Sequence, residues 1–194
     1  MADNWQEVIA NSLQESIATK EGVLANWEQV ARCGQLLIDC LLGGGTIFFI
    51  GNGGSAADAQ HLAAELVGRF ERDNHLPALA LTTDTSCLTA IANDFSYQEV
   101  FVRQVRALMR PGDLLVAIST SGNSLGINLA AQAARDKGCA VVGLSGRDGG
   151  QLKSYCREMV VVPSQRTCRI QESHITIGHI WCEMIERACP APNN

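Results

Sequence analysis

The sequence lacks the features that define several broad classes of protein. It has no excess of basic residues, because 15 Lys and Arg stand against 20 Asp and Glu, for a formal net charge of −5. A basic nucleic-acid-binding surface is therefore not expected. An anionic ligand would have to be held by local dipoles rather than by the overall field of the protein. No apolar run is long enough to span a membrane, so we expect no membrane association.

The cysteines lack the clustered spacing of a structural zinc site or a disulfide framework. There are eight of them, and none forms a CxxC pair. We interpret them as the reduced thiols of a cytoplasmic protein. The opening segment, MADNWQEVIANSLQES, is polar and amphipathic, so we expect no signal peptide.

What the chain does have is an ordinary globular composition, with 194 residues, 46% of them hydrophobic and 18% charged. We expect residues 1–194 to form a single domain with a substantial core. Apolar positions at helical spacing predict that residues 1–42 form a helical segment, which the glycines at 43–45 should end. Trp5, Val8, Ile9, Leu13 and Ile17 give this segment an apolar face that predicts a role in oligomerisation.

Beyond residue 45, short apolar runs alternate with helical patterns. Continuous apolar strands indicate a sheet buried on both faces, and the alternation indicates right-handed βαβ crossovers. We therefore predict an α/β fold with a doubly wound, mostly parallel five-stranded sheet flanked by helices, and an added N-terminal helix. In such a sheet, ligands bind beyond the carboxyl ends of the strands. The predicted strands are residues 46–50, 77–81, 113–119, 140–146 and 158–163.

Two of these strands end in loops that suit a phosphate group. The first loop, GNGGS at 51–55, opens a helix, where free N–H groups favour anions. On its own it could equally be a tight turn capped by Ser55. The second loop, STSGNS at 119–124, combines hydroxyl groups with another helix start. Because two such loops should meet at one sheet edge, we predict a phosphate site there. Asn93 and Asp94 end a short helix after the second strand, either as a polar cap or as ligands of sugar hydroxyls.

His61 and Glu65 lie four residues apart, on one face of the helix that follows GNGGS. The last helix, residues 169–188, carries Gln171 and His179 on roughly one side. Their separation along the axis is about 12 Å, which is long for two ligands of one ion. Either both side chains lean inward, or Gln171 lies on an irregular first turn. We interpret His174, which faces elsewhere, as structural or interfacial.

These residues resemble a known family. GNGGS, ISTSGNS, AIAND at 90–94 and RIQESHITIGHI at 169–180 are similar to motifs of the sugar isomerase (SIS) fold, and in particular of the phosphoheptose isomerase family. The resemblance covers nearly the whole chain. It implies isomerisation of sedoheptulose 7-phosphate, a step toward the heptose of lipopolysaccharide or other surface glycans. It also implies a cytoplasmic homotetramer with sites near subunit interfaces, and one zinc ion per subunit bound by His61, Glu65, Gln171 and His179. The implied substrate contacts are Asn52, Gly53, Gly54, Ser55, Glu65, Asn93, Asp94, Ser119, Thr120, Ser121, Ser124 and Gln171.

The residue types suit this chemistry. Ketose-to-aldose isomerisation through an enediol(ate) needs a base for a carbon-bound proton and an acid for the oxygen, roles that Glu65 and His179 can fill. Imidazole, carboxylate and amide ligands suit zinc without excluding other divalent ions. Two alternatives remain. One is a non-catalytic tetramer of the same fold that binds the bacterial replication initiator, and the other is a sugar-phosphate sensor. Neither of these alternative proteins needs a set of four polar residues such as His61, Glu65, Gln171 and His179 arranged around a metal ion.

Overall fold

Five parallel strands form the centre of the protein. The computed structural model describes residues 4–73 and 75–189. In these ranges the sheet has the order β2-β1-β3-β4-β5, and all four pairings are parallel. The chain leaves β1 toward β2 on one side and later continues from β3 on the other. The direction of strand addition therefore reverses between β1 and β3, which is where ligands bind in such sheets. The strands are β1 (Ile47–Gly51), β2 (Ala78–Ala80), β3 (Leu114–Ile118), β4 (Ala140–Gly146) and β5 (Glu158–Val162).

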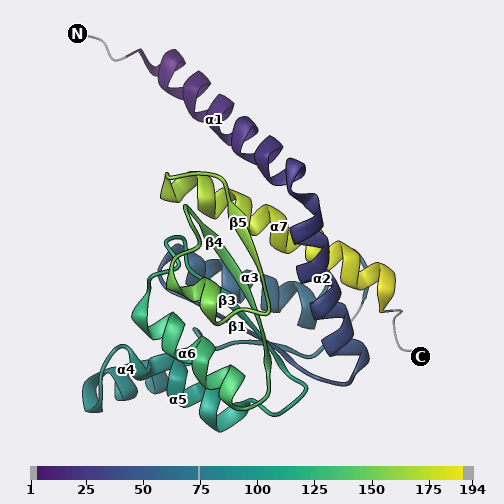
Figure 1. Cartoon of the computed structure of the whole chain (residues 1–194), viewed down its shortest axis with the longest axis vertical. Helices are drawn as coiled ribbons and strands as arrows, with labels where there is room; N and C mark the ends of the chain where they lie inside the picture. Colours follow the sequence, from purple (N-terminus) through teal and green to yellow (C-terminus); the bar gives the residue numbers. More distant parts are fainter. Residues whose placement is uncertain (1–3, 74, 190–194) are drawn as a thin grey trace.

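Helices cover both faces of the sheet (Figure 1). On one face, α2 (Trp27–Leu42), α3 (Gly54–Val67) and α7 (Thr167–Ala188) enclose a core that includes the buried Trp181. On the other, α5 (Glu99–Leu108) and α6 (Leu125–Asp136) enclose a second core, flanked by α4 (Thr85–Asp94) and the short 3-10 helix η1 (Gln151–Ser154). The predicted doubly wound α/β fold is therefore confirmed, with a sheet that is fully parallel. None of the described helices has the length and apolar character needed to cross a membrane.

The N-terminal segment forms two helices where the sequence predicted one. The first, α1 (Trp5–Ala25), ends at Asn26, whose backbone N–H and side-chain amide both donate to carbonyls of the last turn. The glycines at 43–45 end α2 as expected. Most of α1 projects away from the sheet (Figure 1), and Thr19 is the one buried residue within its described range. Its predicted apolar face is consequently exposed.

His174 is a structural residue of the α7 core. It is fully buried, and its Nε2 lies 3.1 Å from the carbonyl oxygen of Ser145 at the end of β4. Since a carbonyl only accepts, Nε2–H is the donor. Burial lowers the pKa of His174 from 6.5 to about 4. Of the two roles considered from the sequence, structural or interfacial, the structure supports the structural one, because His174 lies in the core.

This burial predicts that the protein loses stability in mild acid. The folded state keeps His174 neutral while the unfolded chain takes up a proton near pH 6.5. The free energy of unfolding should therefore fall as the pH drops from 6.5 toward 4, by about 3 kcal/mol from this residue. Urea unfolding across this range would measure the slope in the wild type and in His174→Gln. The variant should be less stable at pH 7 but less sensitive to acid, and equal slopes would contradict the prediction.

Candidate active site

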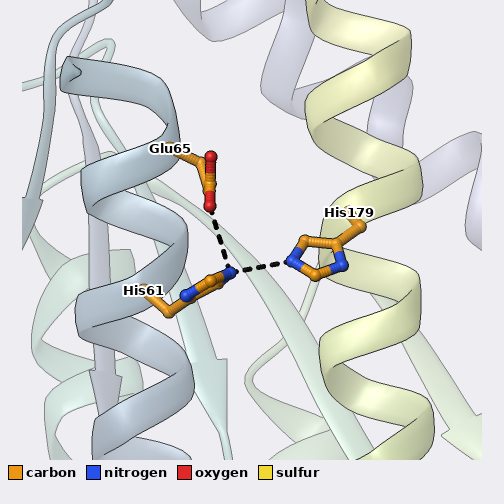
Figure 2. A group of neighbouring side chains, drawn as sticks. All are labelled: His61, Glu65 and His179. Carbon is orange, nitrogen blue, oxygen red and sulfur yellow. Dashed lines mark hydrogen bonds and ion pairs between the residues drawn. The ribbon is translucent and has the colours of Figure 1, made fainter. Parts of the chain in front are cut away.

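The two helices that carry the predicted ionisable residues pack closely together. α3 follows β1, and α7 crosses the same face of the sheet beside it (Figure 1). Gly178 allows the close approach, because a Cβ at this position would overlap the end of the Leu62 side chain. His61 is next to Leu62 in α3, and His179 is next to Gly178 in α7. The two histidines therefore face each other across this contact (Figure 2).

His61, Glu65 and His179 form one compact cluster. The Nε2 atoms of the two histidines are 2.8 Å apart, and His61 Nε2 lies 3.2 Å from Glu65 Oε1. The potential ligand atoms of all three residues lie within 4.8 Å of one another. Glu65 is largely shielded, while about half of the His61 side chain is exposed, so the cluster opens to solvent on one side. Two imidazole nitrogens and a carboxylate oxygen that meet at one point fit a divalent transition metal.

Gln171 lies at the other end of the contact between α3 and α7. The helix is regular from Thr167, which rules out the irregular first turn considered from the sequence. The Gln171 amide instead packs against the start of α3, where a Cβ on Gly54 would lie 2.6 Å from its Nε2. Eight residues of straight helix, about 12 Å, separate it from His179. Within one chain the structure therefore brings together three of the four predicted ligands and places Gln171 beside the GNGGS loop.

Asp58 is an ionisable residue of this region that the sequence analysis missed. It lies on α3 three residues before His61 and therefore on a similar face of the helix. Its Oδ2 is buried and makes no hydrogen bond with the described residues. Burial raises the pKa of Asp58 to about 6, opposed by the nearby His61. The i, i+3 spacing from His61 was the available signal, but it does not by itself separate a buried carboxyl from an exposed one.

The two loops predicted to hold phosphate lie side by side. They follow β1 and β3, which pair directly from Ile47 with Leu114 to Gly51 with Ile118. The Asn52 amide of the first loop donates to Ser124 Oγ of the second, at 3.1 Å. Both loops depend on glycine in the left-handed region, at Gly53 (φ 58°) and Gly122 (φ 65°). A Cβ at Gly122 would also collide with the carbonyl of Gly149.

Within the second loop, the hydroxyl residues differ in exposure. Ser119 is buried and Thr120, Ser121 and Ser124 are partly buried. Ser124 occupies the N-cap position of α6 without a side-chain cap hydrogen bond, so its hydroxyl remains available to a ligand. With the helix N-terminus behind it, this group of hydroxyls can donate to an anion without any basic side chain.

Asn93 and Asp94 end α4 on the exposed surface. The Asn93 amide donates to the Asp94 carboxylate at 2.9 Å, so the structure joins these two to each other. The connection of this segment to the loops runs through Tyr97, whose hydroxyl donates to Asn52 Oδ1 at 2.8 Å. Sequence reasoning did not single out Tyr97, since no spacing or periodicity relates it to the GNGGS loop.

Comparison with known proteins agrees with this fold and identifies the family of the chain. Residues 5–146 match the SIS domain, which defines the class of protein. Curated phosphoheptose isomerases are similar over most of their length. The one from Solidesulfovibrio magneticus is 50% identical over 188 residues, covering 96% of this chain and 92% of that protein. The one from Paramagnetospirillum magneticum is 54% identical over 166 residues, covering 84% of this chain and 86% of that protein.

A solved structure also shows similarity to a phosphoheptose isomerase. The phosphoheptose isomerase from Neisseria gonorrhoeae superposes with a TM-score of 0.90 at 45% identity, covering 95% of this chain and all of the other. The chain belongs to the phosphoheptose isomerase family of SIS domain proteins.

Proposed function

We propose that this chain is an aldose-ketose isomerase that converts sedoheptulose 7-phosphate to D-glycero-D-manno-heptose 7-phosphate. The observation that carries the proposal is the cluster of His61, Glu65 and His179 on helices α3 and α7, where α3 starts at a phosphate-type loop. The family to which the chain belongs supports the same reaction, since relatives about half identical in sequence are phosphoheptose isomerases. The cytoplasm and the synthesis of surface-glycan heptose are the proposed setting.

In the proposed mechanism, the two loops bind the phosphate and the cluster acts on the other end of the sugar. Backbone N–H groups at the starts of α3 and α6, with the hydroxyls of Ser119, Ser121 and Ser124, fix the phosphate. Asn93 and Asp94 supply contacts for sugar hydroxyls. Glu65 takes the proton from the carbon next to the carbonyl, and His179 donates a proton to the oxygen of the enediolate. The same groups reverse their roles to complete the transfer.

The cluster also fits a bound zinc ion, which His61, Glu65 and His179 would hold. Such an ion would polarise the substrate carbonyl and its neighbouring hydroxyl. We retain Gln171 as a fourth ligand in the proposal. Its position beside Gly54 supports the proposed role as a substrate contact within its own subunit, and a role at the metal would require it to reach a neighbouring site or to move.

The proposed assembly is a homotetramer with dihedral symmetry. Its support is the apolar surface that α1 exposes, including Leu13 and Ile17, each about 60% exposed. A groove of about 270 Å³ between the α1–α2 segment and α7 continues this surface and is lined by Val23, Trp27 and Ile180. Light scattering at micromolar concentration should give four times the chain mass of 20.8 kDa. A monomer would contradict the assembly and the sharing of sites between subunits.

An assay on the purified protein tests the reaction. Sedoheptulose 7-phosphate is incubated with the zinc-loaded protein, and the aldose product and solvent deuterium incorporation are followed by NMR. We expect turnover of the phosphorylated ketose and little turnover of free sedoheptulose, because the phosphate loops would be empty. A protein that binds the sugar phosphate without turnover would favour the sensor. One that neither binds nor converts it would favour the non-catalytic tetramer that binds the replication initiator.

A further inference from the structure

Glu186, near the end of α7, is a buried acidic residue that the proposed mechanism does not use. Only 5% of its surface is exposed. Its Oε1 atom accepts hydrogen bonds from the backbone N–H groups of Glu71 and Arg72, at 3.1 and 2.9 Å. The Arg72 guanidinium also donates to the backbone carbonyl of Glu186, at 3.3 Å. Glu186 therefore ties the segment that follows α3 to α7.

The two hydrogen bonds on Oε1 have only one possible direction. A backbone N–H group can only donate, and a carboxylate oxygen can only accept. Hydrogen bonds to an ionised acceptor are also shorter and stronger than those between neutral groups. The carboxylate of Glu186 therefore defines where the backbone of residues 71–72 lies relative to α7.

The anchored part of the chain, residues 68–73, is called here the exit segment, and it turns one side chain inward. Phe70 is partly buried and packs against the core that α7 covers, whereas the other residues of the segment are exposed. The Phe70 ring lies beside the imidazole of His179, with ring centroids 5.7 Å apart and planes inclined by 31°. This spacing is typical of packed aromatic pairs. The backbone held by Glu186 thus places an aromatic ring against one member of the ionisable cluster.

His179 has few other contacts that could fix its ring. Its Nε2 lies 2.8 Å from His61 Nε2 (Figure 2). Histidines that bind a metal usually donate their other ring N–H to a carboxylate or a carbonyl, which fixes the orientation of the ring. No residue within 4–73 or 75–189 forms a hydrogen bond with the second ring nitrogen of His179. The ring of Phe70 fills the space on one side of the imidazole and so prevents its rotation in that direction.

We propose that Glu186 and Phe70 are positioning residues of the metal site. The Glu186 carboxylate holds the exit segment, and through this segment Phe70 keeps His179 Nε2 directed at His61 and Glu65. The inference rests on the proposed function, because it takes the ionisable cluster as the metal site of that isomerase. It assigns a role to a buried carboxylate that lies about two helical turns beyond His179.

Cobalt binding measures this role without reference to turnover. Co²⁺ accepts imidazole and carboxylate ligands, and its visible absorption reports the geometry of those ligands. The Co²⁺-loaded wild type, Phe70→Ala, Glu186→Ala and the double variant are each titrated with a chelator. Loss of a group that orients a metal-binding histidine lowers metal affinity about 10-fold to 100-fold. We expect each single variant to raise the dissociation constant of Co²⁺ by that factor and to alter the absorption band, and the double variant to bind as Phe70→Ala does.

Two further variants separate positioning from general stabilisation. In Glu186→Gln, the amide oxygen has two lone pairs and can still accept both N–H groups, and these two donors fix which way the amide faces. Its Co²⁺ affinity should stay within about threefold of the wild-type value. Glu183→Ala is the matched control, since Glu183 is exposed one turn earlier on α7, where it pairs with Arg187. The control should bind Co²⁺ as the wild type does.

Thermal unfolding is recorded for every variant. If Glu186→Ala does not fold, Phe70→Ala decides the outcome, because it leaves the hydrogen bonds of Glu186 in place. Wild-type affinity and absorption in folded Phe70→Ala would overturn the proposal, as would additive losses in a folded double variant. Equal losses in Glu186→Gln and folded Glu186→Ala would also overturn it.

The failure of this inference can be distinguished from failure of the proposed function. If the wild type does not bind Co²⁺, the positioning role is wrong. If it binds Co²⁺ with the expected pattern but does not isomerise sedoheptulose 7-phosphate, the proposed function fails and the role of Glu186 and Phe70 stands. Normal turnover without that pattern supports the proposed function and removes the positioning role.

Discussion

Replacement of Glu65 by Gln is expected to lower turnover by about 10²–10⁴-fold, the usual contribution of a positioned general base. The amide keeps the size of the side chain and one oxygen near His61, but it cannot accept the carbon-bound proton at neutral pH. The phosphate loops are unchanged, so the variant should still bind substrate. Turnover and exchange of the transferable proton with deuterated solvent would measure the effect.

Metal content must be measured beside turnover, because a carboxylate is a stronger ligand than an amide. Glu28→Gln is a matched control, since Glu28 is exposed in the first turn of α2. A Glu65→Gln protein with full metal occupancy and near-normal exchange would remove Glu65 as the base and leave His179 as the next candidate. A protein that binds substrate and metal but exchanges no proton would support the proposed role.

The second large effect is expected from the double variant Ser119→Ala with Ser121→Ala. It removes two neutral donors from the phosphate loop, each worth about 1.5–3 kcal/mol when the acceptor is charged. The KM should rise by about 10²–10⁴-fold, with a much smaller change in kcat, because the lost contacts lie away from the reacting carbons. Steady-state kinetics would give both constants.

Ser154→Ala provides the control for this variant, since its hydroxyl donates to Gln151 within η1 rather than to a phosphate loop. Ser121 Oγ also accepts from the backbone N–H of Asn123, so thermal unfolding should be recorded to detect a disordered loop. An unchanged KM in a folded double variant would show that the phosphate binds elsewhere.

Much of the fold could be predicted because the relevant signals are local. Continuous apolar runs marked the five strands, and parallel pairing followed from their alternation with helices. The meeting of the two phosphate loops followed from the same logic, since both come after neighbouring strands. The break at Asn26 carried no comparable signal, because apolar residues continue at helical spacing on both sides of it.

The site was predictable where residues share a helix and less so where contacts cross between segments. The spacing of His61 and Glu65 placed them on one face, whereas the approach of His179 depends on the packing of Gly178 against Leu62. The position of Gln171 beside Gly54 depends on the relative offset of α3 and α7, which no periodicity encodes. The link from Tyr97 to Asn52 spans 45 residues and could be recognised only in three dimensions.

The location of α7 also has a consequence for the order in which the newly made chain matures. His61 and His179 are 118 residues apart, and α7 is the last described helix. The same helix brings Trp181, which donates to the Val30 carbonyl, into the core beneath α2 and α3. Because synthesis proceeds from the N-terminus, a ribosome-bound chain must leave the part of this apolar core that α7 covers exposed until α7 emerges. Premature termination within α7 would therefore yield a product that is inactive and also prone to aggregate.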